Sequence, residues 1–480
     1  MQLARKTTVL ALEFWGFYAC VCNMQDASTQ VRVKMESAGL SSAAIRAFLH
    51  QYEKLAGNET GSIPENSISP IAMLPSIEGQ SLPDDPGKLT AQTVVLKLNG
   101  GLGTGMGLEK AKSLLRVRGE LAFLDIIVRQ ALRLRADASV GLLFMNSFST
   151  SAETLAALAR YPELGVPTDL ELMQNKVPKI DVKSLLPIEW PSNPPLEWCP
   201  PGHGDLYPSM LGSGLLRKLL ADGKKYLFVS NADNLGATLD LRILKYFSEL
   251  NAPFLMEVTR RTGVDRKGGH LAMRKSDHRL LLRESAQCPE ADLDYFQDIE
   301  RHRYFNTNSL WIHLDYLQSE LDRGDGLLPL PLIRNVKTVD PRDKKSPKVY
   351  QLETAMGAAI ECFEGAAAVD VPRSRFAPVK TTADLLAVRS DAYELDDQFR
   401  LLLRPERDGV PPIIKLDDRY KLVDDFERLV SGGVPSLARC KTLSIEGSFE
   451  FEPDVEIVGN VQFVNDDPEA KVIKAGRYEG

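Results

Sequence analysis

The sequence has few cysteines, no CxxC pair and no long uninterrupted apolar segment. Its six cysteines stand at positions 20, 22, 199, 288, 362 and 440, and its histidines are scattered. This spacing argues against a zinc site or a disulfide framework, so we expect free thiols in a reducing compartment. Because no run of about 18 uncharged apolar residues occurs, we expect no membrane partner.

Blocks of positive charge are absent as well. The chain carries 58 Lys and Arg residues against 65 Asp and Glu, a formal net charge of −7. Without a Lys/Arg-rich block, this balance argues against a nucleic acid as the partner. Any phosphate that the protein binds must therefore be neutralised by a few local cations.

The N-terminal end looks unlike the rest of the 480-residue chain. Arg5 and Lys6 precede an apolar run, as in a signal peptide, but Glu13 interrupts that run. We interpret residues 1–27 as a disordered extension and expect a cytoplasmic protein. A peroxisome-like microbody is the alternative, because residues 32–40 partly resemble a peroxisomal signal.

Residues 28–88 are predicted to form a mainly helical N-terminal domain. Within 41–56, helical spacing separates the apolar residues Ile45, Phe48, Leu49, Tyr52 and Leu55. Residues 58–86 are rich in Gly, Pro and Ser, which indicates an irregular connection.

Residues 89–390 alternate between strand and helix patterns. Strands are predicted at 94–98, 140–145, 226–230 and 254–258, with a helix at 123–134 and another that a capping box opens at Thr150 and Glu153. This alternation predicts an α/β domain with a mixed, mainly parallel sheet. Ligands of such sheets bind at the carboxyl ends of the strands, where the glycine-rich loop and residues 231–234 both lie.

Residues 391–480 form the last predicted domain, and its pattern has a period of six. Leu443, Phe449, Val455 and Val461 recur at this interval, and turn residues such as Gly447 and Gly459 share it. Such a repeat is typical of a β-helix, with a pair of β-hairpins as the alternative. The polar tail that follows favours a monomer over a homo-oligomer.

The loop GLGTGMG after the first central strand is the strongest candidate for a phosphate site. It lacks the Gly-Lys-Ser/Thr of a P-loop, and it fails the G-x-G-x-x-G frame of a dinucleotide-binding loop. Glycines let backbone amides approach a ligand closely, and Lys112 can neutralise phosphate oxygens. A flexible turn with a solvated lysine remains the alternative.

With its neighbours, LKLNGGLGTGMG resembles the nucleotide-binding loop of eukaryotic-type UDP-glucose pyrophosphorylases, the UTP–glucose-1-phosphate uridylyltransferases. Further segments match this family in order over residues ~30 to ~465: ELMQNKVPKI, PPGHGDLYPSMLGSG, FVSNADNLGAT, RKGGHLA, LRESAQCP, YFNTNSLWI, PKVYQLETAMGAAI and VPRSRFAPVKTTADLL. So many ordered motifs are far more specific than a single glycine loop.

The resemblance implies a reversible, Mg²⁺-dependent reaction in which UTP and glucose 1-phosphate give UDP-glucose and pyrophosphate. It also implies a helical N-terminal part, a central Rossmann-like nucleotidyltransferase domain and a C-terminal left-handed β-helix. The attacking sugar-phosphate oxygen is already ionised, so direct in-line attack needs no covalent intermediate and no general base. Positioning and electrostatic stabilisation are sufficient.

Matching positions imply the roles of individual residues. The catalytic group would be Lys112, Lys380 and Asp233, and Asp233 would also bind the metal. The nucleotide would contact Leu98, Asn99, Gly100, Gly101, Gly103, Thr104, Gly105, Gly107, Gln174, Gly202 and Asp233. The sugar phosphate would contact His203, Asn231, Gly268, Gly269, Glu284, Phe305, Asn306, Asn308 and Lys380.

Ordinary roles remain open for several of these residues. Lys112 and Gln174 could be surface residues, His203 structural, and Phe305 part of the core. Arg373 and Arg375, near Lys380, could bind phosphate or form structural ion pairs. The chain also departs from the wider pattern, with Ala111 in place of a proline before Lys112 and Ala232 in place of a glycine before Asp233; the first change should loosen the lysine loop.

Two other functions stay in view. A broader UDP-sugar or UDP-N-acetylhexosamine pyrophosphorylase would differ only in the shape of the sugar pocket. A non-catalytic nucleotide-sugar sensor would keep the pocket but would not need Lys112, Asp233 and Lys380 together. The failed dinucleotide frame disfavours a dehydrogenase.

Overall fold

The computed structural model describes residues 27–480, without the side chain of Val264. Apart from Ala27, which is helical together with residues 28–37, the predicted extension lies outside this range. Cys199, Cys288, Cys362 and Cys440 are free thiols, as expected, whereas Cys20 and Cys22 lie outside the described residues. No helix within residues 27–480 is long and apolar enough to cross a bilayer.

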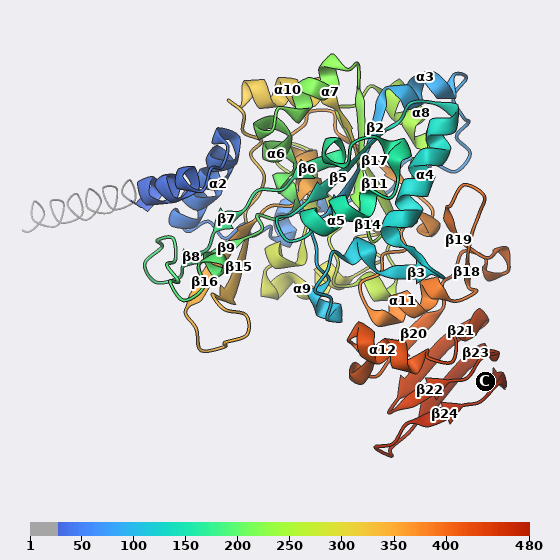
Figure 1. Ribbon diagram of the computed structural model, residues 1–480. Helices are drawn as coiled ribbons and strands as arrows, with labels where there is room; N and C mark the ends of the chain where they lie inside the picture. The colour runs from blue at the N-terminus through green and yellow to red at the C-terminus, as the bar shows by residue number, and fades with distance from the viewer. Residues whose placement is uncertain (1–26) are drawn as a thin grey trace, which may run out of the picture.

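The N-terminal helices lie at one side of the molecule, at the left of Figure 1. Helix α2 (Ser42–Ala56) begins after Ser41, whose hydroxyl accepts a hydrogen bond from Ala44 N. Its predicted apolar face is buried against β8 (Ile180–Asp181) and β16 (Lys348–Glu353), which form a small sheet with β15 (Ile333–Thr338). The helix prediction at 41–56 is confirmed.

The centre of the molecule is a ten-stranded mixed sheet. Its main path runs β1 (Ile68–Pro70), β12 (His270–Arg274), β14 (Tyr304–His313), β10 (Tyr226–Asn231), β2 (Thr93–Asn99), β5 (Gly141–Asn146), β6 (Glu171–Met173), while β13 (Leu280–Arg283) pairs with β12, β11 (Phe254–Arg260) with β14, and β17 (Ala367–Asp370) with β11. Strands β10, β2, β5 and β6 are parallel, whereas β14 runs antiparallel to its neighbours. The predicted mixed sheet is confirmed, and its long parallel part is the β10–β6 half.

Helices cover both faces of this sheet (Figure 1). On one face lie α4 (Phe123–Asp137) and α8 (Leu241–Leu250); on the other lie α6 (Leu206–Gly212), α7 (Leu215–Ala221) and α10 (Leu314–Arg323). Alternate strand residues serve the two layers, as Phe228 packs on the first and Val229 on the second. The predicted α/β architecture follows from this alternation.

The other helices, and the strands that belong neither to the sheets above nor to the C-terminal stacks described below, are short. They are α3 (Pro86–Ala91), α5 (Ser151–Leu158), α9 (Leu293–Gln297), α11 (Thr382–Arg389), α12 (Val423–Leu429), β3 (Arg116–Arg118), β4 (Leu121–Ala122), β7 (Val177–Pro178), β9 (Trp198–Cys199), β18 (Tyr393–Leu395) and β19 (Leu401–Leu403). Strand β1 lies in the predicted 28–88 domain yet pairs with β12 of the central sheet. The domain boundaries at 28–88, 89–390 and 391–480 stay predictions.

The C-terminal strands stack in parallel at the lower right of Figure 1. One stack is β20 (Ile413–Leu416), β21 (Ser436–Glu446), β23 (Val455–Val464) and β25 (Gly476–Glu479); the other is β22 (Phe449–Phe451) and β24 (Lys471–Ile473). The register places Leu443 opposite Val461, two members of the six-residue repeat. Because hairpins pair their strands antiparallel, the hairpin alternative is wrong.

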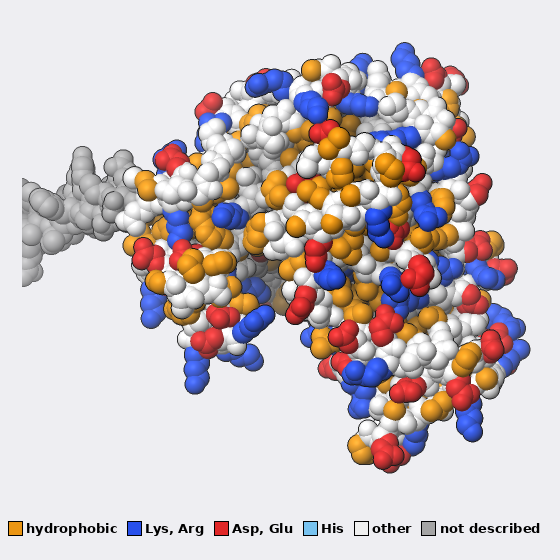
Figure 2. Space-filling view, in the orientation of Figure 1, with side chains coloured by type: hydrophobic (Ala, Val, Ile, Leu, Met, Phe, Trp, Pro, Cys, Tyr) orange, Lys and Arg blue, Asp and Glu red, His pale blue; other side chains and the backbone are white. Residues whose placement is uncertain are grey.

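The C-terminal strands share one core with the central domain. Leu443 and Phe449 belong to the same cluster of buried side chains as Phe228 and Trp311. On the outside, Figure 2 shows basic and acidic side chains interspersed over these strands. The continuous core fixes the C-terminal strands against the layer that contains α4 and α8.

A lysine lies buried beneath the ends of the central strands. Only 2% of Lys97 in β2 is exposed, and its Nζ donates to Ser230 Oγ (2.7 Å) and Ala237 O (2.6 Å). These acceptors flank the turn 231–236 that follows β10, so the ammonium joins both ends of the turn. Burial, and secondarily the Arg375 guanidinium, lower the pKa of Lys97 to about 7.

We predict that Lys97→Met lowers the free energy of unfolding by about 2–4 kcal/mol, because Ser230 and Ala237 lose a buried donor.

The low pKa of Lys97 also makes stability depend on pH. The unfolded chain keeps this lysine protonated to higher pH, near 10.5, and therefore binds more protons than the folded chain above pH 7. The wild type should gain stability relative to the variant between pH 7 and pH 9, measured by urea denaturation. The exposed Lys415→Met is the control, and equal pH slopes in wild type and Lys97→Met would contradict the prediction.

Candidate functional site

A cleft of about 430 Å³ opens where β2, β5 and β10 end. Its walls come from segments far apart in the sequence. They include the predicted residues Leu98, Asn99, Gly100, Gly101, Lys112, Gln174, Gly202, His203, Asn231, Asp233, Asn308 and Lys380. The start of the glycine loop, Gly100 and Gly101, and residues 231–233 therefore line one crevice, whereas Gly103–Gly107 and Asn234 are not among its lining residues.

The glycine loop brings Lys112 back to the end of β2. Lys112 N donates to Gly101 O (3.1 Å), and a Cβ on Gly103 would lie 3.3 Å from Lys112 Cγ. Gly103 has a φ of +71°, which glycine adopts without strain. Thr104, Gly105 and Lys110 are exposed outside the cleft. Lys112, and not Lys110, is the loop's inward charge.

In the same loop region, Gly107 and the side-chain nitrogen of Asn99 contact other parts of the protein. Gly107 lies against Leu422 of the C-terminal region, where an added Cβ would be 3.2 Å from Leu422 Cδ2. The Asn99 side chain is buried and donates to Asn146 Oδ1 (2.7 Å) and Thr154 Oγ1 (2.9 Å). The Asn99 amide nitrogen is therefore already hydrogen-bonded within the protein.

Two lysines converge on one carboxylate oxygen. Lys112 Nζ donates to Asp233 Oδ2 (2.9 Å), and Lys380 Nζ donates to the same atom (2.8 Å). Lys112 also donates to Val379 O, and Val379 N donates to Asp233 O (3.0 Å). The Lys112 and Asp233 side chains are mostly buried, whereas 56% of the Lys380 side chain is exposed.

The other carboxylate oxygen of this group suits a metal ion. Asp233 Oδ1 is buried and has no hydrogen-bond partner among the described residues. Within residues 27–480 there is no cluster of three or more His, Cys, Asp or Glu residues that could hold a metal. A hard cation such as Mg²⁺ needs only one or two carboxylates when water and phosphate oxygens complete its coordination, so Asp233 fits this ion.

Gln174 and Gly202 lie next to each other in the wall of the cleft. Gln174 N donates to Asn146 O (2.7 Å), and its Nε2 donates to Gly202 O (2.9 Å). A Cβ on Gly100 would lie 2.7 Å from Gln174 Oε1, so only glycine leaves room for the amide there. The carboxamide keeps an oxygen that can accept a hydrogen bond from a ligand.

His203 is held as a neutral imidazole. Its Nδ1 accepts a hydrogen bond from Met356 N (2.9 Å), which places the ring proton on Nε2. Burial, and secondarily the charge of Lys380, lower the pKa of His203 to about 4. His203 lines the cleft and can donate from Nε2 but cannot act as a cation at neutral pH.

A second group of predicted residues packs beside the cleft. A Cβ on Gly268 would lie 1.9 Å from Phe305 Cε2, and a Cβ on Gly269 would lie 2.5 Å from Glu284 Oε2. The paired glycines therefore allow the backbone to lie directly on a ring and a carboxylate. Burial raises the pKa of Glu284.

A pair of asparagines connects this group to the cleft. Asn306 N donates to Gly269 O (3.2 Å), and Asn306 Nδ2 donates to Asn308 Oδ1 (2.9 Å). Asn308 N in turn donates to Asn306 Oδ1 (2.9 Å), and Asn308 has a φ of +56° at an irregularity in β14. The left-handed residue turns its side chain into the cleft wall.

The predicted capping box at Thr150 and Glu153 is wrong, although the helix that it opens is present. The Thr150 side chain makes no cap hydrogen bond and instead accepts from Ser147 N (3.0 Å). Glu153 Oε2 accepts from Ala111 N (3.2 Å), a donor that proline would lack. The alanine that replaces proline thus ties the lysine loop to α5.

Comparison with known proteins identifies this arrangement. A protein-family model described as UTP–glucose-1-phosphate uridylyltransferase matches residues 45–458. The chain belongs to this family. The uridylyltransferase of Saccharomyces cerevisiae is 42% identical over 380 residues, 78% of this chain and 74% of the yeast protein. That of Solanum tuberosum is 41% identical and covers 83% of this chain and 80% of its own.

Solved structures agree with this family membership. A mutant UDP-glucose pyrophosphorylase of Leishmania major, in complex with UDP-glucose, superposes with a TM-score of 0.89 at 48% identity. The match covers 95% of this chain and 99% of that one. A UDP-glucose phosphorylase of Trypanosoma brucei reaches a TM-score of 0.87 at 50% identity, with 94% and 98% covered.

Two buried side chains that hold the site of this uridylyltransferase-family protein in place were not predicted from the sequence. Lys97 fixes the turn that carries Asp233, and its only signal was a lysine inside the apolar strand VVLKLN. Asp205 accepts from Asn175 N (2.7 Å) and so anchors the residue after Gln174. Burial raises the pKa of Asp205 to about 6.

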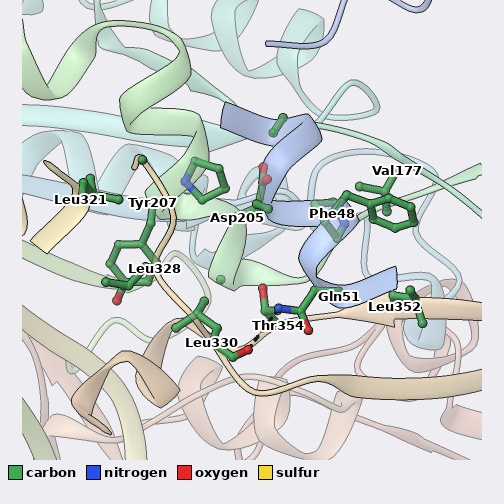
Figure 3. A pocket seen from close by; sticks show the side chains of 16 residues that line it. Phe48, Gln51, Val177, Asp205, Tyr207, Leu321, Leu328, Leu330, Leu352 and Thr354 are labelled. Carbon is green, nitrogen blue, oxygen red and sulfur yellow. Dashed lines mark hydrogen bonds between the residues drawn. The ribbon is translucent and has the colours of Figure 1, made fainter. Parts of the chain in front are cut away.

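Asp205 also lines a small cavity of about 40 Å³. Figure 3 shows Phe48 and Gln51 of α2 lining this cavity with Asp205 and Tyr207, and Gln51 Nε2 donates to Leu330 O (3.0 Å). The N-terminal helix therefore packs against the element that supports Gln174.

We predict that Gly202→Ala lowers the free energy of unfolding by about 1–3 kcal/mol, because alanine is strained at a left-handed φ. Here φ is +79°, and the new Cβ would lie 2.5 Å from Thr354 O. Gly105→Ala is the control in urea denaturation, because nothing lies within 4 Å of its Cβ. Equal stability of the two variants would contradict the strain.

Proposed function

We propose that the protein catalyses the reversible reaction of UTP with glucose 1-phosphate to give UDP-glucose and pyrophosphate. The observation that carries this proposal is the meeting of Lys112 and Lys380 at Asp233 inside the cleft. Two cations from segments far apart suit a site that must join two polyanions. Membership of the uridylyltransferase family supports the same reaction.

The proposed chemistry needs no protein nucleophile. An oxygen of the sugar phosphate attacks the α-phosphorus of UTP, the bond to the β-phosphate bridge breaks, and pyrophosphate leaves with that electron pair. Lys112 and Lys380 stabilise the charge that develops on the transferred and departing groups. The neutral His203 is suited to donate a hydrogen bond to a phosphate or base oxygen, and no proton transfer is required of it.

We further propose that Mg²⁺ is the cofactor and that Asp233 holds it through Oδ1. The ion would supply charge neutralisation between phosphate groups. The unpartnered, buried Oδ1 supports this assignment. Lys112 and Lys380, which donate to Oδ2, would bind the phosphates of the two substrates.

The two ends of the site divide the recognition of substrate. Gln174, beside Gly100 and Gly202, would read the uracil edge with its amide. Asn231, Asn308 and Glu284 would bind hexose hydroxyls, and the Gly268–Gly269 backbone would close the sugar pocket over Phe305. We also propose that the parallel C-terminal stacks wind as a short left-handed β-helix, which the register of Leu443 with Val461 supports.

A pyrophosphate-release assay tests the reaction. The protein is incubated with UTP, Mg²⁺ and, separately, glucose 1-phosphate, galactose 1-phosphate and N-acetylglucosamine 1-phosphate. We expect fastest release with glucose 1-phosphate and none after chelation with EDTA. If none of the three sugar phosphates leads to pyrophosphate release, a non-catalytic sensor is favoured. Faster release with N-acetylglucosamine 1-phosphate than with glucose 1-phosphate would show that glucose is not the preferred sugar.

We predict that Lys380→Ala lowers kcat by about 100- to 1000-fold, the range for loss of one preorganised charge donor. Its melting temperature should change little, because an exposed ion pair contributes at most about 1 kcal/mol. Lys110→Ala is the matched control, since Lys110 is an exposed lysine in the same loop as Lys112. Near-normal turnover of Lys380→Ala would remove Lys380 from the mechanism.

A further inference from the structure

The loop 261–269, between β11 and β12, is organised around one carboxylate. Asp265 Oδ2 accepts from Thr262 N (2.9 Å) and Thr262 Oγ1 (2.8 Å). Asp265 O accepts from Gly268 N (2.9 Å), and only 6% of the Asp265 side chain is exposed. The position of Gly268 is therefore tied to that of Asp265.

Arg373, from a distant part of the chain, forms an ion pair with this carboxylate. Its Nη1 donates to Asp265 Oδ2 (2.7 Å) and its Nη2 donates to Asp265 Oδ1 (3.0 Å). A bidentate pair of this kind fixes orientation as well as distance. Arg373 begins the same segment, 373–380, that ends at Lys380.

Aromatic contacts return from Arg373 to the loop. The Arg373 guanidinium carbon lies 5.2 Å from the centre of the Phe376 ring. The Phe376 ring centre lies 5.1 Å from that of Phe305, and Phe305 packs directly on Gly268. The contacts thus form a closed circuit that includes Arg373. The loop has a second attachment at Arg261, whose Nη2 donates to Asp265 O (3.1 Å) and Arg266 O (2.8 Å), so displacement of Arg373 would loosen the loop without detaching it.

We propose that Arg373 is a positioning residue for the hexose phosphate, acting through Asp265 on the Gly268–Gly269 backbone. The inference rests on the proposed function for the identity of the ligand. From the sequence, Arg373 could bind phosphate or form an ordinary structural ion pair; the proposal gives its ion pair a role in binding the sugar phosphate. Among the described residues, Arg373 makes no hydrogen bond or ion pair with Gly100, Gln174 or Gly202, so its effect should be confined to the sugar end.

The first test compares how a substitution changes the KM for glucose 1-phosphate and the KM for UTP. Arg373→Gln should raise the KM for glucose 1-phosphate about 10-fold, with the KM for UTP and kcat within about threefold of wild type. Arg373→Lys, which keeps the charge but not the fork, should recover part of the loss. An equal rise of both KM values, or none, would overturn the proposal.

Arg389 provides a matched structural control. It also forms a bidentate pair, with Glu427 (3.0 and 2.8 Å), and its guanidinium carbon lies 5.4 Å from the Phe426 ring. Arg389→Gln should lower stability about as much as Arg373→Gln without changing the ratio of the two KM values. The same change of ratio in both variants would show that Arg373 acts only through global stability.

A double-mutant cycle separates positioning from direct contact with phosphate. If Arg373 acts through Asp265, then Asp265→Asn raises the KM for glucose 1-phosphate as Arg373→Gln does, and the double variant is no worse than either. If Arg373 itself binds the phosphate, the two effects add or Asp265→Asn has none. The second pattern would overturn the proposal.

Hydrogen exchange gives a readout that needs no turnover. Arg373→Gln should speed amide exchange in residues 261–269 and leave residues 98–112 unchanged, whereas Arg389→Gln should not affect 261–269. Unchanged exchange in 261–269 would overturn the proposed positioning role of Arg373. A wild type that released no pyrophosphate would overturn the proposed function, while the exchange comparison would still decide the role of Arg373 in the loop.

Discussion

Two hydrogen bonds from the Asn234 side chain hold the site together. Asn234 Nδ2 donates to Arg375 O (3.1 Å), and its Oδ1 accepts from Ala377 N (3.0 Å). They fix the segment 373–380 along the turn after β10. This position of the segment lets Lys380 reach Asp233. It also lets the Arg375 guanidinium form a bidentate ion pair with the buried Glu257 (2.7 and 2.8 Å). Arg373 leaves the same segment toward the sugar loop, so one stretch of backbone serves both the phosphate and the hexose.

The charge of the site is local, as an acidic chain requires. Lys112 and Lys380 share a single oxygen of Asp233, so these three side chains together carry one net positive charge in a cleft of a chain whose net charge is −7. In the proposed reaction, arriving phosphates replace Asp233 Oδ2 as the partner of the lysines. Because the ammonium groups already lie in the cleft, little reorganisation accompanies that exchange.

The sequence predicted the parts of the fold and site that depend on local patterns. The strands at 94–98 and 226–230, the loop after each, and the two lysines could be found because apolar runs, glycines and matching motifs are contiguous. The partners of Lys97, Glu153 and Arg373 could not, because each pair joins residues brought together only by the sheet or by the path of the 373–380 segment. The capping box failed for this reason at Glu153, which accepts from the distant Ala111 amide. At Thr150 the competitor is local, because the hydroxyl accepts from Ser147 N.

Ala111 shows that the lysine loop can be restrained in two mutually exclusive ways. Its φ of −52° is close to the value of about −65° that a proline ring imposes, so the backbone there does not distinguish the two residues. A ring would fix the dihedral permanently but remove the N–H that Glu153 accepts. This chain has instead a hydrogen bond to a carboxylate, which can open and reform. The restraint on Lys112 thus depends on the Glu153 carboxylate of α5 and not on a ring within the loop itself.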